Sequence, residues 1–300
     1  MIKPPKLQYG DTIGIVAPCL KVNRDKMEES IAALQATGFQ VKKAAHLYSE
    51  AWSFAGSLEE RVEDFNTMIA DDDVRMIFFG GGEVCNELLP YLDYGTLQRR
   101  PKIVCSYSDS TTLLNAINCM SGLVTFYGAS PRTFAVLNDY NRKSFAARLM
   151  EGSLTYTKAM PWRTICPGHC EGVLTGGYLA NYALLYGLTY YPQMPYEKCL
   201  LFIEDHEMFS VPSIVSKYFA NLEHRGVLER ATGLIFGHYS VEASPVIDDI
   251  LFRVGEKHGI PVVRCEDFGH GVYNAVLPIG VTAELDTDTN QLAFLEAGVV

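Results

Sequence analysis

The sequence contains no long hydrophobic run and no excess of positive charge. It carries 25 Lys and Arg residues against 35 Asp and Glu residues, which gives a formal net charge of −10. Nucleic-acid phosphates and anionic membrane surfaces repel a chain of this charge, so we expect no non-specific binding to either. Residues 1–18 lack the sustained apolar segment of a secretory signal, and no run reaches transmembrane length. These absences predict a cytoplasmic protein without a membrane partner.

The usual sequence signatures of a cofactor are also missing. Three consecutive glycines at 80–82 form neither a GxGxxG motif nor a phosphate-binding loop with its lysine, so nucleotide binding is poorly supported. Cys166 and Cys170 stand close together, but no second Cys or His pair lies near them in sequence to complete a zinc site. There is no HExxH motif, and neighbouring residues of the acidic segment 204–207 would point to opposite faces of a strand. We therefore expect reduced thiols, no metal and no cofactor.

The chain has the composition of a globular protein, with 48% hydrophobic and 20% charged residues among 300. In the first half, short apolar runs alternate with segments of helical periodicity, and Ser57 with Glu60 forms a capping box at the start of one helix. This alternation predicts a doubly wound, mostly parallel sheet. The predicted strands cover residues 12–17, 41–44, 76–79, 103–105 and 123–126.

The second half repeats the alternation and ends in a two-stranded piece. Between the halves lies a less regular segment rich in proline and glycine. We predict an N-terminal α/β domain over 1–150, a linker over 151–170 and a C-terminal domain over 171–300. Strands of the second half are expected in the apolar runs near 199–203, 234–236, 261–263, 282–285 and 291–295.

A turn between a buried strand and a helix contains the first candidate nucleophile. The apolar run 103–105 is followed by Ser106, Tyr107, Ser108 and Asp109, and helical periodicity begins at Ser110. A serine at such a corner is held out over the sheet edge, and the amides of the following helix point at whatever it attacks. The alternative is that these residues only cap the helix. From this stretch alone the cap is the favoured interpretation.

The triple glycine would lie at the same sheet edge as Ser108, because loops at the carboxyl ends of parallel strands gather there. A backbone without Cβ atoms can approach a substrate closely and direct an amide at it. The glycines can equally well tighten a turn, and the sequence favours neither reading.

A serine nucleophile needs a base, and the base needs an orienting acid. His206 and His238 each follow the end of a predicted strand, and His270 lies in an FGHG loop. Spacing does not choose among these three histidines. Glu204 ends an apolar strand, where a buried carboxylate must be paired; an unpaired acid at a surface strand end is the alternative.

Seven segments carry a resemblance to a known family. Together they resemble the LD-carboxypeptidase family, which includes the microcin C self-immunity peptidases, in colinear order from Lys3 to Glu296. The segments are KPPKLQYGDTIGIVAP, SLEERVEDFNTMIADDDVRMIFFGGGEVCNELLPYLDY, PKIVCSYSDSTTLLNAI, GLVTFYGAS, EGVLTGGYLANYALLYGL, LLFIEDHE and EDFGHG.

The resemblance implies a serine peptidase with a Ser-His-Glu triad. The family motifs fall on Ser108 as nucleophile, Glu204 as acid and His270 as base, with the backbone amides of Asp109 and Gly82 for the oxyanion. It also implies a flavodoxin-like N-terminal domain, a smaller β-rich α/β C-terminal domain, a homodimer and no metal.

Two departures from the family pattern affect the expected substrate site. Ser106 stands where the family usually has glycine, and Gly80 stands where many members have arginine. The loop that includes Gly81 and Glu83 also differs, and it borders the substrate. Tyr107 is a further substrate-binding candidate. Arg132 is a candidate for the terminal carboxylate that a carboxypeptidase must bind; a surface arginine without such a role is the alternative.

Three functions remain open at the level of sequence. The leading hypothesis is cleavage of the amide between an L-centre and a C-terminal D-amino acid in short murein peptides. The second is hydrolysis of peptidyl or aminoacyl nucleotides, which needs an aromatic platform for the base; Tyr156 and Trp162 are available, but packing is the expected role of Trp162. The third is a non-catalytic module that binds peptide fragments.

Overall fold

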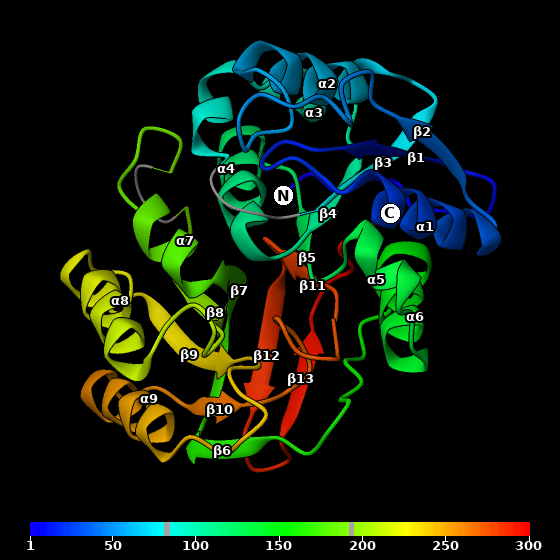
Figure 1. Cartoon of the computed structure of the whole chain (residues 1–300). Helices are drawn as coiled ribbons and strands as arrows, with labels where there is room; N and C mark the ends of the chain where they lie inside the picture. The colour runs from blue at the N-terminus through cyan, green and yellow to red at the C-terminus, as the bar shows by residue number, and fades with distance from the viewer. Residues whose placement is uncertain (81–84, 192–194) are drawn as a thin grey trace.

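Two β-sheets organise the chain, and helices cover them (Figure 1). The computed structural model describes residues 1–80, 85–191 and 195–300. Within these residues the first sheet has six strands in the order β11-β5-β4-β3-β1-β2, all parallel except β11. The strands are β1 (Thr12–Val16), β2 (Gln40–Lys43), β3 (Val74–Phe79), β4 (Ile103–Ser106), β5 (Thr125–Tyr127) and β11 (Leu277–Ile279).

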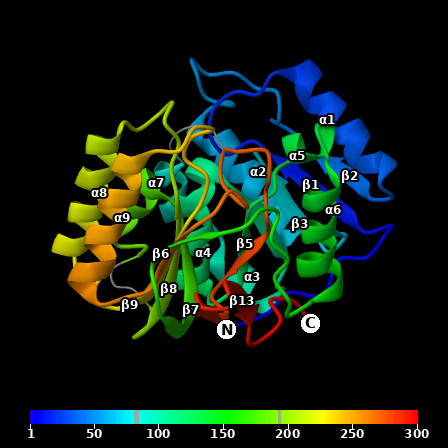
Figure 2. The ribbon, with the colours of Figure 1, turned by 90° about the horizontal axis from the view of Figure 1, so that it is seen from below.

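Helices cover both faces of the first sheet (Figures 1 and 2). The predicted capping box of α2 is present: the Ser57 hydroxyl accepts the Glu60 N–H at 3.2 Å, and the Glu60 carboxylate accepts the Ser57 N–H at 2.7 Å. No helix of the described residues is both long and apolar enough to cross a bilayer. The helices are α1 (Arg24–Ala36), α2 (Leu58–Ala70), α3 (Tyr94–Arg99), α4 (Thr111–Ser121), α5 (Pro131–Ala135) and α6 (Asp139–Phe145).

The second sheet has seven strands in the described residues, in the order β13-β12-β7-β8-β9-β10-β6. Its centre, β7 to β10, is parallel, and the outer strands are antiparallel. Helices α7 (Leu179–Leu185), α8 (Pro212–His224) and α9 (Pro245–His258) line one face (Figure 1). The strands are β6 (Arg163–Cys166), β7 (His169–Tyr178), β8 (Cys199–Glu204), β9 (Ala231–Phe236), β10 (Val262–Arg264), β12 (Thr282–Asp286) and β13 (Gln291–Phe294).

Two short strands were not predicted from the sequence. β6, in the segment expected to be an irregular linker, pairs with β10 in the second sheet. β11, near the C-terminus, pairs with β5 in the first sheet, so the chain returns to its N-terminal half. Strands of three or four residues have too few side chains to give a clear period of two. The return continues to the last residue, where the Val300 N–H donates to the Pro4 carbonyl at 3.0 Å.

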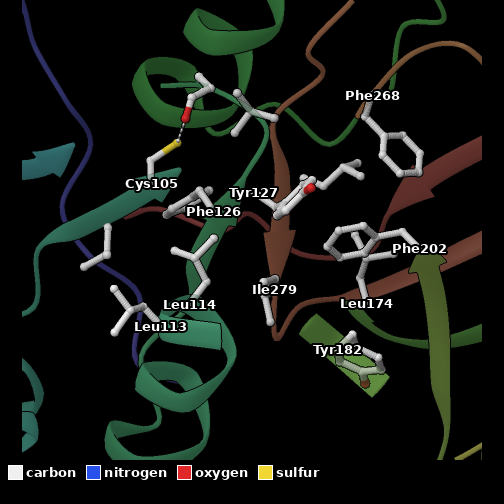
Figure 3. Packing of buried hydrophobic residues seen from close by; sticks show 14 of the residues in the cluster. Cys105, Leu113, Leu114, Phe126, Tyr127, Leu174, Tyr182, Phe202, Phe268 and Ile279 are labelled. Carbon is white, nitrogen blue, oxygen red and sulfur yellow. Dashed lines mark hydrogen bonds between the residues drawn. The ribbon is translucent and has the colours of Figure 1, made fainter. Parts of the chain in front are cut away.

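The hydrophobic core is continuous across the junction of the two sheets (Figure 3). The ring of Tyr127, at the end of β5, has its centroid 5.5 Å from that of Phe202 on β8. Phe202 in turn meets Phe268 edge to face at 5.8 Å. All three side chains are buried. The sheets therefore share one packed interior, and the junction is rigid.

Buried polar side chains of α4 also tie the sheets together. The Asn115 side-chain amide donates to the Gly176 carbonyl of β7 at 2.9 Å. The Asn118 amide donates to the Ile279 carbonyl of β11 at 3.2 Å. Because each pairing satisfies groups that would otherwise be buried without partners, α4 is held in one position relative to both sheets.

We predict that Gly128→Ala will strongly destabilise the protein. Gly128 has φ of +143°, and a Cβ there would lie 2.1 Å from the Ala275 carbonyl oxygen, where β5 and β11 approach each other. Backbone strain and overpacking together should cost about 3 kcal/mol or more in urea unfolding.

Gly259→Ala is the matched control, because Gly259 also has positive φ, +63°, but no atom lies within 4 Å of its added Cβ. We expect this variant to lose only about 1 kcal/mol. Similar losses in the two variants would contradict the importance of the close approach at Gly128.

Candidate active site

Ser108 occupies a tight corner between β4 and α4. Its backbone φ is +63°, in the left-handed region that residues other than glycine rarely adopt. Two hydrogen bonds hold this conformation: the Ser108 N–H donates to the Tyr127 hydroxyl at 3.0 Å, and the Thr111 hydroxyl donates to the Ser108 carbonyl at 2.7 Å. Strain of this kind persists only where the surroundings impose it.

The structure does not give Ser108 the capping role that the local sequence favours. The Ser108 hydroxyl lies 2.8 Å from Nε2 of His270, on a loop between β10 and β11. Ser110, at the N-cap of α4, makes no side-chain capping bond, and its hydroxyl bonds to that of Ser106 at 2.7 Å. The Ser106 hydroxyl also donates to the Phe79 carbonyl. The residue that departs from the family glycine thus joins the ends of β3 and β4 to the turn.

Glu204, the last residue of β8, meets the other nitrogen of His270. Its Oε2 lies 2.9 Å from Nδ1 of the imidazole, and the carboxylate is fully buried. Ser108, His270 and Glu204 therefore form one hydrogen-bonded chain across the junction of the two sheets. Such an arrangement can remove a proton from the serine hydroxyl and stabilise the imidazolium that results.

The local electrostatics favour the charged form of His270. Burial alone would lower its pKa, but the charge and hydrogen bond of Glu204, with further help from Asp109 and Asp205, outweigh burial. The net effect raises the pKa of His270 above its ordinary value. A histidine in this position is a stronger base than one in water.

The other two candidate histidines, His206 and His238, are not part of the hydrogen-bonded chain formed by Ser108, His270 and Glu204. His238 is buried and its Nδ1 bonds to the Glu266 carboxylate. His206 is half-buried, with its ring centroid 6.0 Å from that of His270. Tertiary contact thus distinguishes His270 from the two histidines that spacing left equivalent.

Tyr127 belongs to the site, although the sequence analysis did not select it. Its hydroxyl donates to Oε1 of Glu204 at 2.6 Å while accepting the Ser108 N–H. Burial, and then the Glu204 charge, raise the pKa of Tyr127 well above its ordinary value, so the phenol keeps its proton. The available signal was its place at the carboxyl end of a parallel strand, where site residues gather.

Asp205 is a second buried carboxyl group beside Glu204. Its Oδ1 accepts the His206 N–H at 2.7 Å, and Oδ2 is buried without a hydrogen-bond partner among the described residues. Burial raises the pKa of Asp205 to about 7. A carboxyl that holds its proton near neutrality avoids a second buried negative charge next to Glu204.

The glycines of the FGHG loop allow the loop to pack tightly. Gly269 has φ of +107°, and a Cβ there would lie 2.9 Å from Oε2 of Glu204. A Cβ on Gly271 would lie 2.8 Å from the His238 ring. The backbone on both sides of His270 therefore rests directly against its neighbours, which restricts where the imidazole can lie.

A cavity of about 380 Å³ opens beside His270. Tyr107 and Arg132, both predicted to bind substrate, line it, and the Tyr107 ring centroid is 5.4 Å from that of His270. Arg132 is exposed and forms no ion pair with an acidic side chain of the described residues. The full lining is Tyr107, Arg132, Thr133, Val136, His206, Met208, Phe209, His270, Gly271 and Asn274.

The expected oxyanion and loop residues are only partly described. Asp109 directly follows Ser108, and its carbonyl accepts the Asn181 side-chain amide at 3.3 Å. Gly81, Gly82 and Glu83 lie outside the described residues. In the part of the chain that is described, no cluster of three His, Cys, Asp or Glu side chains is arranged to hold a metal ion.

Comparison with known proteins identifies the family. The LD-carboxypeptidase N-terminal domain matches residues 13–128, and the LD-carboxypeptidase C-terminal domain matches residues 171–285. The probable murein peptide carboxypeptidase of Bacillus subtilis is 30% identical, over 99% of this chain and 95% of that protein. The microcin C7 self-immunity protein MccF of Escherichia coli is 28% identical, over 97% of this chain and 94% of that protein.

Solved structures share the same architecture. Ligand-free wild-type MccF has a TM-score of 0.90 at 25% identity, and the match covers 100% of both chains. Muramoyltetrapeptide carboxypeptidase from Oxalobacter formigenes has a TM-score of 0.79 at 24% identity, over 94% of this chain and 97% of that one. These likenesses confirm the predicted two-domain α/β fold. With the two domain matches and the 30% identical relative, they show that the chain belongs to the LD-carboxypeptidase family.

Proposed function

We propose that this protein is a serine carboxypeptidase that hydrolyses the amide between an L-centre and a C-terminal D-amino acid in short murein peptides. The observation that carries the proposal is the hydrogen-bonded chain Ser108–His270–Glu204 beside an open cavity. The B. subtilis relative, whose name is probable murein peptide carboxypeptidase, supports the substrate class.

In the proposed mechanism, the Ser108 hydroxyl oxygen attacks the scissile carbonyl while Nε2 of His270 takes its proton. Glu204 accepts a hydrogen bond from Nδ1–H of His270 and stabilises the imidazolium. The imidazolium then gives the proton on Nε2 to the leaving amine. The resulting acyl-enzyme is hydrolysed by water, with His270 again as the base. We propose the backbone amides of Asp109 and Gly82 as donors to the oxyanion.

Substrate recognition is assigned to the cavity beside His270 and to the neighbouring glycine loop. Arg132 offers a guanidinium for the terminal carboxylate, since no described acidic side chain neutralises it. Tyr107 forms part of the cavity wall. Gly81 and Glu83 are proposed to border the substrate from the loop.

An acyl-nucleotide substrate is the alternative, and the linker segment argues against it. Trp162 is buried, with its indole N–H donating to the Asp267 carboxylate at 2.8 Å. Tyr156 packs edge to face against it at 5.4 Å. Trp162 is thus buried and the half-buried Tyr156 is packed against it, so this pair is a poor platform on which a base could stack. A module that only binds fragments would have no use for the proton-transfer chain at Ser108.

We also propose a cytoplasmic homodimer without nucleic-acid or membrane partners, with domains over 1–150 and 171–300 and a linker over 151–170. The family resemblance supports the dimer and the domain division. The net charge of −10 supports the absence of nucleic-acid and membrane binding.

The function is tested by comparing kcat/KM for an L,D-linked murein tetrapeptide and for an aminoacyl-sulfamoyl adenosine. We expect release of the terminal D-alanine to be the faster reaction, and Ser108→Ala to reduce turnover about 10⁴-fold or more with unchanged thermal unfolding. Faster hydrolysis of the adenosine compound would overturn the substrate assignment. A fully active Ser108→Ala variant would overturn the mechanism.

We predict that Tyr127→Phe will impair both turnover and stability. The change leaves a Glu204 oxygen and the Ser108 N–H without their buried partner, which should cost about 1–3 kcal/mol in unfolding. A misplaced nucleophile should lower kcat about 10- to 100-fold. Tyr182→Phe is the control, because it removes another buried hydroxyl whose contacts, at 3.4 and 3.5 Å, lie away from the site. Equal kcat in both variants would remove Tyr127 from the mechanism.

We predict an acid limb in kcat/KM with its midpoint above pH 6.5. Protonated His270 cannot accept the serine proton, so activity falls as pH drops through its raised pKa. In Glu204→Gln the largest influence that raises the pKa of His270 is lost while burial remains, so the midpoint should move to lower pH, with reduced kcat.

Asp205→Asn is the control for this pH profile, because burial raises the pKa of Asp205 to about 7, within the range of the acid limb. The acid limb should remain in this variant, shifted slightly downward by the loss of one nearby acid. Disappearance of the limb would assign it to Asp205.

A further inference from the structure

We propose that His206 is a specificity-determining residue that donates a hydrogen bond from Nε2 to the terminal carboxylate of the substrate, alongside Arg132. This inference rests on the proposed function and adds a residue to the same site. From the sequence His206 was only one of three candidates for the base, and it is His270 that contacts the Ser108 hydroxyl.

His206 lies where it can reach a bound substrate. It is the second residue after the end of β8, two positions from Glu204, and it lines the same cavity as His270 and Arg132. Its backbone is fixed, because its N–H donates to Oδ1 of Asp205 at 2.7 Å. Its ring packs 5.8 Å from that of Phe209, another residue of the cavity wall.

A backbone contact determines which nitrogen of His206 carries the proton. The Met208 N–H donates to Nδ1 at 3.0 Å, so Nδ1 is an acceptor and the neutral ring must hold its proton on Nε2. Burial, and then the neighbouring His238 and His270, lower the pKa of His206, so the ring is neutral at pH 7. Nε2–H is then a donor, and it has no hydrogen-bond partner in the described part of the chain.

Among the other polar side chains of the cavity, the Asn274 amide is occupied, whereas the Tyr107 and Thr133 hydroxyls keep their hydrogens as further donors. Both hydrogens of the Asn274 amide go to carbonyls, those of Gly269 and Tyr273, at 2.9 and 3.0 Å. The Thr133 hydroxyl accepts the Ser130 N–H at 3.1 Å.

Arg132 and the Nε2–H of His206 thus bring donors to one cavity that no described carboxylate lines. Two donors match the two oxygens of a carboxylate, which accepts hydrogen bonds and offers none. A terminal carboxamide presents a single acceptor and a competing donor, so the pair should discriminate between the two groups.

The test compares the murein tetrapeptide with its C-terminal carboxamide. The wild-type protein should prefer the acid in kcat/KM. His206→Phe should reduce that preference about 10- to 100-fold, mainly through KM, because one charge-assisted hydrogen bond is lost. His206→Gln should restore part of it, since a glutamine amide can supply a donor near the place of Nε2. His224→Phe is the control: it makes the same substitution at an exposed histidine at the end of α8, outside the cavity, and should leave the preference unchanged.

A second readout does not depend on turnover. In the ¹⁵N NMR spectrum of the wild-type imidazoles, His206 should be the Nε2–H tautomer. Its Nε2 resonance should shift with N-acetyl-D-alanine and not with N-acetyl-D-alanine amide.

The two measurements separate the inference from the proposed function. Failure of the wild type to cleave the tetrapeptide would overturn the function, and the NMR titration would still decide the role of His206. An Nδ1–H tautomer, no shift with N-acetyl-D-alanine, or equal losses for acid and carboxamide in His206→Phe would each overturn the inference.

Discussion

The buried hydrogen bond between Tyr127 and Glu204 is the contact on which the arrangement of the site depends. A carboxylate with no exposure to solvent is costly unless its oxygens are paired, and here the phenol takes one and His270 the other. The same phenol accepts the Ser108 N–H, so one hydroxyl links the Ser108 turn to Glu204. Removing it would affect both the buried carboxylate at the end of β8 and the amide in the turn after β4.

The path of the chain explains why His270 can lie between the sheets. The loop that carries it leaves β10 of the second sheet and enters β11 of the first. Both ends of this loop are thus held by strands of different sheets, while Gly269 and Gly271 pack against Glu204 and His238. The hydrogen bonds of α4 to β7 and β11 fix the same junction from the other side. The position of His270 is therefore a property of the interface, and movement between the sheets would disrupt it.

The strained conformation of Ser108 follows from the same interface. Its amide, carbonyl and hydroxyl are each bonded to a different element: Tyr127 at the end of β5, Thr111 in α4, and His270 in the loop before β11. A residue other than glycine whose backbone φ is +63° needs this degree of constraint to persist. The site thus stores strain at Ser108 and offsets it with packing and hydrogen bonds from both sheets.

Local sequence determined most of the strands, the capping box at Ser57 and the polar residues at strand ends, because side-chain periodicity and capping act over a few residues. The family resemblance then named Ser108, Glu204 and His270, a choice that spacing could not make. Tertiary structure decided that Ser108 bonds to a histidine instead of capping a helix, that His206 and His238 lie beside the triad, and that Tyr127 joins it. It also decided the places of β6 and β11. These outcomes depend on contacts between residues far apart in the chain, such as Ser108 with His270, and no local pattern encodes such a contact.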